Sequence, residues 1–348
     1  MRFWTTIVVI VAVMGCGAEP TPETADTGAW EAASCNTDAS LRGLSVVNDQ
    51  VAWASGSGGT FVRTADGGLT WSAGTISGAE SLDLRDVHGW SADRATVISA
   101  GHPGKIFLTE DAGRHWAEVY SNETEGIFFN SMAFWDMRHG IAVGDPLDGR
   151  FLLIRTDDGG STWAELPIEN RPEALPNEAN FAASGTCLAV AEENLVWFGT
   201  GGPAARVFRS VDRGNSWRVS ETPLRSGEAS QGVFGVLFLS PSQGIIVGGD
   251  YLDEPNATAN VAFTRDGGKT WSPVEPGPAG FRECATTMGL DPRRLMTVGP
   301  SGSDVSIDGG LSWQPVESEG RMHAADFSPE GNLGVAVGAK GLVAVWRR

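Results

Sequence analysis

The stretch Thr264-Arg-Asp-Gly-Gly-Lys-Thr-Trp271 decides the fold of this 348-residue chain, because the same pattern recurs along most of its length. The shared form is Ser/Thr-x-Asp-x-Gly-x-Ser/Thr-Trp. Its six copies centre on the aspartates Asp66, Asp111, Asp158, Asp212, Asp266 and Asp308. One copy departs from the form, with His115 in place of the second hydroxyl residue. A motif repeated in one register indicates a repeat architecture.

The chemistry of the motif predicts a tight turn. Its aspartate is suited to accept hydrogen bonds from backbone N–H groups, and its glycine suits a positive φ angle. The hydroxyl side chains tie the turn together, and the tryptophan packs beneath it as a large apolar plug. We therefore interpret the six aspartates as structural rather than catalytic.

The spacing of the copies predicts the size of the repeating unit. Successive aspartates lie 45, 47, 54, 54 and 42 positions apart, which suits a four-stranded propeller blade with loops of varying length. Before each motif come an apolar strand, a turn, a second strand ending in glycine, and a third strand. In the third repeat we expect these strands at residues 129–134, 140–144 and 150–156.

A seventh set of three strands is expected after the last motif, at residues 322–327, 334–338 and 341–346. The missing fourth strand is predicted near residues 28–35, after a degenerate copy of the motif that runs from Thr24 to Trp30. The alternative is that this segment only continues an N-terminal tether. The prediction is an all-β, seven-bladed β-propeller of four-stranded antiparallel blades, with the last blade closed by an N-terminal strand.

The N-terminal sequence has the pattern of an export signal. Arg2 precedes an apolar run of eleven residues, from Trp4 to Met14, which is too short for a permanent membrane span. The following Gly15-Cys16 resembles a bacterial lipobox, in which the cysteine becomes acylated. We expect a signal peptide at 1–15, a lipidated Cys16 with a flexible tether at 16–27, and the propeller at 28–348. The alternative is an ordinary signal peptide with a spare cysteine.

Composition narrows the choice of partners and compartment. The formal net charge is −18, and nucleic acids are bound through clusters of Lys and Arg, so no nucleic-acid partner is expected. Contact with a membrane is expected through the lipid anchor only. Three further cysteines, Cys35, Cys187 and Cys284, do not form a complete disulfide framework. A Cys187–Cys284 bridge and buried free thiols both remain open.

The motif copies are Asp boxes, and together with the Gly-rich second strands they resemble the extracytoplasmic propellers of the photosystem II stability and assembly factor family. The resemblance covers nearly the whole mature chain. It implies a seven-bladed, non-enzymatic scaffold in the bacterial cell envelope, anchored by lipid and facing the periplasm or the exterior. Sialidases and xyloglucan-active hydrolases share the box, so the motif identifies the architecture better than the activity.

The candidate binding site lies on the face opposite the boxes, where long loops gather in blades 3 to 5, at residues 144–150, 168–184, 199–206, 220–232 and 248–260. Long loops on a rigid scaffold often carry binding residues. Aligning the blades places one residue at the entry of each innermost strand: Arg42, Arg85, Asn130, Gly185, Phe234, Arg282 and His323.

Arginine recognises carboxylates and phosphates with two hydrogen bonds. We therefore predict a cationic ring for an acidic ligand or a protein partner, built on Arg42, Arg85, Asn130, Arg282 and His323. An Arg-rich patch serves partner binding in the family, and the ring looks similar. The alternative is that these arginines pair with neighbouring acids such as Asp86 and Glu283. Asp250 and Tyr251 complete the candidate set. Their acidic loop is a candidate to bind a cation or a sugar, and the alternative is a solvated loop without a ligand.

The sequence gives less support to the hypothesis that the protein is an enzyme. The sequence contains no GxSxG, Walker or HExxH motif, and no cofactor or metal site is expected. A sialidase-like, glycan-acting hydrolase would use Arg42, Arg85, Arg282, Tyr251 and Asp250, but sialidase propellers have six blades. This hydrolase and a small-ligand-binding lipoprotein are the alternatives to a non-enzymatic protein-binding scaffold.

Overall fold

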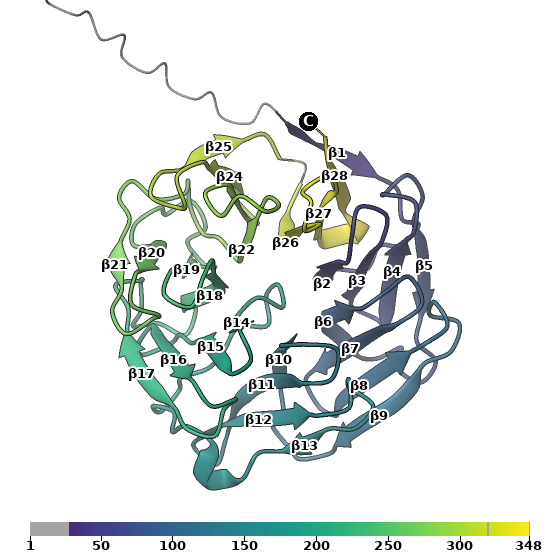
Figure 1. Cartoon of the computed structure of the whole chain (residues 1–348), viewed down its shortest axis with the longest axis horizontal. Coiled ribbons are helices and arrows are strands. Elements are labelled where there is room, and N and C mark those ends of the chain that lie inside the picture. The colour runs from purple at the N-terminus through teal and green to yellow at the C-terminus, as the bar shows by residue number, and fades with distance from the viewer. Residues whose placement is uncertain (1–27, 319, 348) are drawn as a thin grey trace, which may run out of the picture.

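Seven four-stranded antiparallel sheets form a ring in the computed structural model, which describes residues 28–318 and 320–347 (Figure 1). The architecture is the seven-bladed β-propeller that the sequence predicts. The expected signal peptide, Cys16 and tether lie outside the described residues.

Each of the first six blades contains four consecutive strands, ordered from the centre of the ring to its rim. Blades 1 and 2 contain β2 (Leu41–Val46), β3 (Ala52–Gly56), β4 (Thr60–Thr64), β5 (Ser72–Thr75), β6 (Asp83–Gly89), β7 (Ala95–Ala100), β8 (Gly104–Thr109) and β9 (Ala117–Asn122). Blades 3 and 4 contain β10 (Phe129–Phe134), β11 (Gly140–Leu147), β12 (Arg150–Thr156), β13 (Ala164–Glu165), β14 (Leu188–Ala191), β15 (Leu195–Gly199), β16 (Arg206–Ser210) and β17 (Arg218–Glu221). Blades 5 and 6 contain β18 (Gln231–Phe238), β19 (Gly244–Asp250), β20 (Val261–Thr264), β21 (Ser272–Pro273), β22 (Cys284–Thr287), β23 (Leu295–Gly299), β24 (Gly302–Ser306) and β25 (Gln314–Val316).

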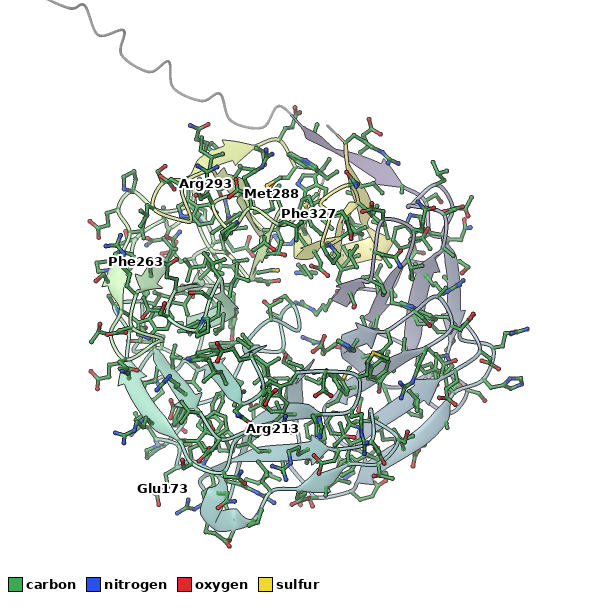
Figure 2. The ribbon with its side chains drawn as sticks, in the orientation of Figure 1. Glu173, Arg213, Phe263, Met288, Arg293 and Phe327 are labelled. Atoms are coloured by element: carbon green, nitrogen blue, oxygen red, sulfur yellow. The ribbon has the colours of Figure 1, made fainter. Side chains whose placement is uncertain are left out.

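Blade 7 closes the ring with strands from both ends of the chain. It contains β26 (Met322–Phe327), β27 (Gly334–Gly338), β28 (Val343–Arg347) and the N-terminal β1 (Ala29–Ala33) on the outside. Trp30 of β1 packs edge-on against Trp346, with ring centroids 5.1 Å apart. Both rings contact Phe327 of β26, which is labelled in Figure 2. The predicted closure by an N-terminal strand is confirmed, because this strand covers the backbone edge of β28.

The six Asp boxes share one hydrogen-bond pattern. In the box of blade 5, Thr264 Oγ1 donates to Asp266 at 2.9 Å and accepts from the N–H of Gly268 at 2.9 Å. The carboxylate of Asp266 accepts from the backbone N–H of Thr270 at 2.9 Å and from its hydroxyl at 2.7 Å. Gly268 has φ +84°, as the turn requires. These contacts are the turn-closing hydrogen bonds that the motif predicts.

The second box shows how the exceptional residue fits. His115 Nδ1 lies 2.6 Å from Asp111 Oδ2, at the position that a hydroxyl occupies in the other copies. Hydrogen bonds from the side chains of His115 and Thr70 lower the pKa of Asp111 and Asp66, respectively, to about 2.

The apolar core lies between adjacent blades rather than in one central mass. One cluster joins Leu41 and Val62 of blade 1 to Val335 and Val345 of blade 7. Cys187 and Cys284 are buried in different clusters, and with Cys35 they are free thiols. Of the two alternatives that the sequence left open for these cysteines, the structure shows buried thiols.

Strand direction defines two faces of the ring. First strands run towards the boxes, so the boxes and the turns that join first to second strands share one face, which we call the box face. The opposite face carries the beginnings of the first strands and the longest loops, and we call it the pocket face.

Candidate functional site

Irregular positions in the innermost strands direct the candidate side chains. In five blades the pairing of the first two strands skips one residue, which leaves a β-bulge. The skipped residues are Arg42, Arg85, Asn130, Phe234 and His323. Because bulges redirect side chains, these residues leave the regular alternation of the sheet at the pocket face. In these five blades the sequence alignment therefore identified structurally equivalent positions.

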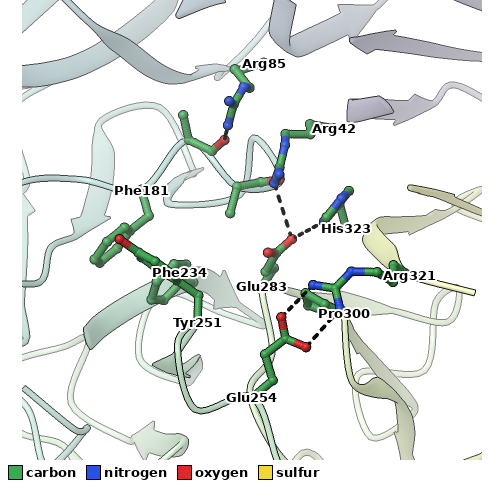
Figure 3. Close-up of a pocket in the computed structure, with 12 residues that line it drawn as sticks. Arg42, Arg85, Phe181, Phe234, Tyr251, Glu254, Glu283, Pro300, Arg321 and His323 are labelled. Carbon is green, nitrogen blue, oxygen red and sulfur yellow. Dashed lines mark hydrogen bonds and ion pairs between the residues drawn. The ribbon is translucent and has the colours of Figure 1, made fainter. Parts of the chain in front are cut away.

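A pocket of about 330 Å³ opens on the pocket face (Figure 3). Its lining comes from first strands, from the segments before them, from two of the long loops, 168–184 and 248–260, and from the turn between β23 and β24. The lining residues are Arg42, Arg85, Phe181, Ala182, Ala183, Phe234, Tyr251, Glu254, Glu283, Pro300, Arg321 and His323.

Two guanidinium groups hold one wall of the pocket. Arg42 donates to the carbonyl of Ala183 at 3.1 Å, and Arg85 donates to the carbonyl of Ala182 at 2.7 Å. Both carbonyls belong to the 168–184 loop, which leads from blade 3 into blade 4. The two arginines therefore hold this loop in place and also face the pocket. Burial lowers the pKa of Arg42, an effect that the charge of Glu283 opposes.

Acidic groups balance much of this positive charge. Glu283 lies 2.7 Å from Nδ1 of His323 and 3.7 Å from Arg42. Arg85 is paired with Asp83 at 2.7 Å, whereas Asp86 turns away and accepts the N–H of Met132 in the next blade. The alternative that the arginines pair with neighbouring acids is therefore realised for both Arg42 and Arg85, through Glu283 and Asp83, whereas Asp86 pairs with neither.

A second ion pair spans the pocket mouth. Arg321, just before β26, binds Glu254 of the blade 5 loop through two hydrogen bonds of 3.1 and 2.5 Å. These bonds raise the pKa of Arg321. The side chain of Arg321 is 54% exposed, so its guanidinium is open to a ligand that approaches from solvent.

Aromatic rings form the opposite wall. Phe181 and Phe234 stack with ring centroids 3.8 Å apart, and Tyr251 meets both rings edge-on at 6.5 and 6.2 Å. Figure 3 shows these rings on the side of the pocket away from Arg321 and His323. The pocket therefore joins an apolar surface to a set of charged hydrogen-bonding groups.

Three residues singled out in the sequence lie outside the pocket lining. Arg282 is fully buried and donates to Asp304 at 2.7 and 2.5 Å. Asp250 is buried and accepts from Gln231 at 2.9 Å, and Asn130 donates to Asp145 at 3.0 Å. Their contacts are internal to the fold, so only Arg42, Arg85, His323 and Tyr251 of the predicted set meet in one place.

Arg321 and Phe181 are among the lining residues that the sequence analysis did not single out. Arg321 lies before the innermost strand of blade 7 and belongs to no repeated position. Phe181 falls within the long 168–184 loop, but its apolar character did not mark it as a binding residue. Both are brought into the pocket by contacts between segments far apart in the chain.

Among residues 28–318 and 320–347, no three His, Cys, Asp or Glu side chains are grouped to hold a metal ion. No helix within these same ranges is long and apolar enough to cross a bilayer.

Comparisons with known proteins agree with this class of fold. The family model described as photosynthesis system II assembly factor YCF48 matches residues 22–126, and the BNR/Asp-box repeat model matches residues 262–273. The chain is thus a BNR-type, Asp-box β-propeller similar to the photosystem II assembly factors.

Particular relatives extend the likeness to most of the chain. The photosystem II assembly lipoprotein Ycf48 of Picosynechococcus sp. is 25% identical over 313 residues, which cover 88% of this chain and 82% of that protein. A solved structure described as YCF48 bound to D1 peptide superposes with a TM-score of 0.61 at 18% identity, over 92% of this chain and 95% of that one. A GH74 xyloglucanase from Xanthomonas campestris has a TM-score of 0.63 at 16% identity, but this chain covers only 53% of it. At such low identities the two structures show the fold alone.

Proposed function

We propose that this chain is an extracytoplasmic, lipid-anchored scaffold without catalytic activity, which binds a segment of a partner protein in the pocket on the pocket face. One observation carries the proposal. A rigid ring of seven blades places Arg42, Arg85 and Arg321 opposite an aromatic wall of Phe181, Phe234 and Tyr251.

The relatives support both parts of the proposal. Two similar proteins are named photosystem II assembly lipoproteins, which favours a lipid anchor at Cys16 and a location outside the cytoplasm. A similar structure is described as bound to a D1 peptide, which favours a protein segment as the ligand. We assign this chain the same type of role, namely holding part of a membrane protein while that protein is assembled.

The lining of the pocket indicates the chemistry of the bound segment. An acidic side chain of the partner suits the exposed guanidinium of Arg321 and the neighbouring Arg42, because arginine binds carboxylates through paired hydrogen bonds. An apolar side chain suits the aromatic wall, where burial of apolar surface adds affinity. A segment that carries both, side by side, matches both walls.

A hydrolase would require two carboxylates free to act on a sugar. The two in this pocket are already engaged, Glu254 by Arg321 and Glu283 by His323 and Arg42. The scaffold function therefore fits these residues better than glycan hydrolysis.

Site-specific photo-cross-linking in the native envelope tests the proposal. A photoreactive residue replaces Tyr251 in the pocket or, as a control, Val219 on the exposed outer strand β17. We expect a discrete cross-linked protein from position 251 that is absent from position 219. Equal products at both positions, or none at position 251, would contradict the proposal.

A further inference from the structure

The chain enters the propeller on the box face. Ala29, the first residue of β1, pairs with Arg347 at the end of β28, and third strands end on the box face. The entry point thus corresponds to the position of a seventh box. Cys16 precedes Gly28 by twelve positions, so an anchor at Cys16 lies within about 40 Å of this entry point.

The boxes on either side of this entry differ from the others at one variable position, between the glycine and the second hydroxyl residue. In blades 1 and 6, which flank blade 7, this residue is Leu69 or Leu311. The four boxes farther away carry polar residues there, Arg114, Ser161, Asn215 and Lys269. Figure 1 shows β1 between the blade that ends in β25 and the blade of β2 to β5.

These leucines are exposed rather than packed. Leu69 is 76% exposed and Leu311 44%. Leu290, in the turn between β22 and β23 of blade 6, also lies on the box face and is 82% exposed. The box geometry does not require an apolar side chain here, because polar residues occupy the same position elsewhere. Three large exposed apolar side chains therefore lie on the box face of the two blades that flank the entry point.

We propose that the sector of the box face formed by blades 6, 7 and 1 rests on the bilayer that holds the lipid anchor, with Leu69, Leu290 and Leu311 inserted among the lipid head groups. Leucine side chains gain free energy on leaving water for the acyl boundary, and a nearby anchor keeps the concentration of lipid high. The chain is strongly acidic, and Asp66 and Asp308 stand beside these leucines, so the surface suits zwitterionic rather than anionic lipid.

This orientation directs the pocket away from the anchoring bilayer. The pocket face is opposite the box face, so a partner segment reaches Arg321 and Tyr251 from the aqueous side. The inference rests on the proposed anchor at Cys16, but it is independent of what the pocket binds.

Depth-dependent fluorescence quenching tests the orientation in the full lipidated chain. An environment-sensitive dye is attached in separate Leu69→Cys and Leu290→Cys variants, and the chain is placed in phosphatidylcholine vesicles that contain a lipid-borne quencher. The native thiols do not compete, because Cys35, Cys187 and Cys284 are buried.

Two labelled controls bracket the proposed surface. Leu252→Cys places the dye on the pocket face at a residue that is 78% exposed, and Met137→Cys places it on the box face of the distant blade 3 at one that is 59% exposed. We expect several-fold stronger quenching at positions 69 and 290 than at either control. Equal quenching at position 252 would overturn the contact, and equal quenching at position 137 would overturn the choice of sector.

A second measurement removes the anchor. In a chain that begins at residue 17, and so has neither the apolar signal segment nor Cys16, vesicle binding is compared before and after the triple change Leu69→Ser, Leu290→Ser and Leu311→Ser. We expect binding to phosphatidylcholine to fall about tenfold, and added phosphatidylglycerol not to restore it. Unchanged binding would overturn the inference, whereas loss of cross-linking from position 251 alone would affect only the proposed function.

Discussion

The two faces of the propeller are held together in different ways. On the box face, each turn is closed by hydrogen bonds within eight consecutive residues, as between Thr264 and Thr270. On the pocket face, Arg42 reaches a loop carbonyl 141 positions away, and Arg321 binds Glu254 at a separation of 67. Each turn of the box face is therefore determined by its own eight residues, whereas the pocket depends on assembly of the whole ring.

The largest effect is expected from opening the ring, on which both faces depend. Trp30→Ala removes a buried ring that packs against Trp346 and Phe327, and it should lower the free energy of unfolding by about 3–5 kcal/mol. Urea denaturation measures the loss. Glu31→Ala, at the exposed neighbouring position, is the matched control and should be almost neutral. A small effect of Trp30→Ala would mean that β1 is dispensable for closure.

Two arginines on the pocket face are expected to have different roles, Arg282 in stability and Arg321 in binding. Arg282→Ala leaves Asp304 as a buried carboxylate without its guanidinium partner, and it should cost about 3–5 kcal/mol of stability. Arg321→Ala breaks a pair that is partly exposed, so it should cost no more than about 1 kcal/mol. Equal losses of stability, measured by thermal and urea unfolding, would contradict this division.

A box aspartate should matter for stability and not for binding. Asp158→Ala leaves the backbone N–H and hydroxyl of Thr162 without their acceptor, for a loss of about 1–3 kcal/mol. The adjacent Asp157→Ala removes an exposed acid at a variable position of the same box and is the control. Cross-linking from position 251 should persist in both variants, and its loss in Asp158→Ala would show that the two faces are coupled.

The smallest effect concerns acid stability. Hydrogen bonds from Thr70 lower the pKa of Asp66 to about 2, below the usual value of about 3.9 in an unfolded chain. A carboxyl whose pKa is lower in the folded state contributes stability that is complete above the unfolded pKa and is lost as the pH falls through the folded pKa. The stability difference between wild type and Asp66→Asn should therefore be constant from pH 7 to about 4 and shrink towards pH 2. A difference that grows on acidification would contradict the assigned pKa.

The sequence predicts the box face almost completely, because a local motif has only local requirements. Six copies of the motif, their spacing and the final unpaired strands were enough to predict seven blades and closure near Trp30. The bulge residues Arg42, Arg85 and His323 were found because they too occupy a repeated position.

The rest of the pocket does not repeat, and the sequence could not assemble it. Arg282 has the same place in the alignment as Arg42, but Asp304 in the third strand of the same blade keeps it within the fold. Arg321 and Phe181 reach the pocket only because blades 4 and 7 face each other across the ring. The repeat thus predicts where along the innermost strand a charged side chain lies. Which groups that side chain contacts depends on the assembled structure.

Affinity capture of detergent-solubilised envelope proteins shows directly whether this pocket binds a partner protein. The full chain is compared with the triple variant Arg42→Ala, Arg85→Ala and Arg321→Ala, and with Arg218→Ala on the outer strand β17 as a control. We expect the wild type and the control to capture a defined membrane protein, and the triple variant to lose it while its ring remains folded. Equal capture by all three proteins would contradict partner binding at this pocket.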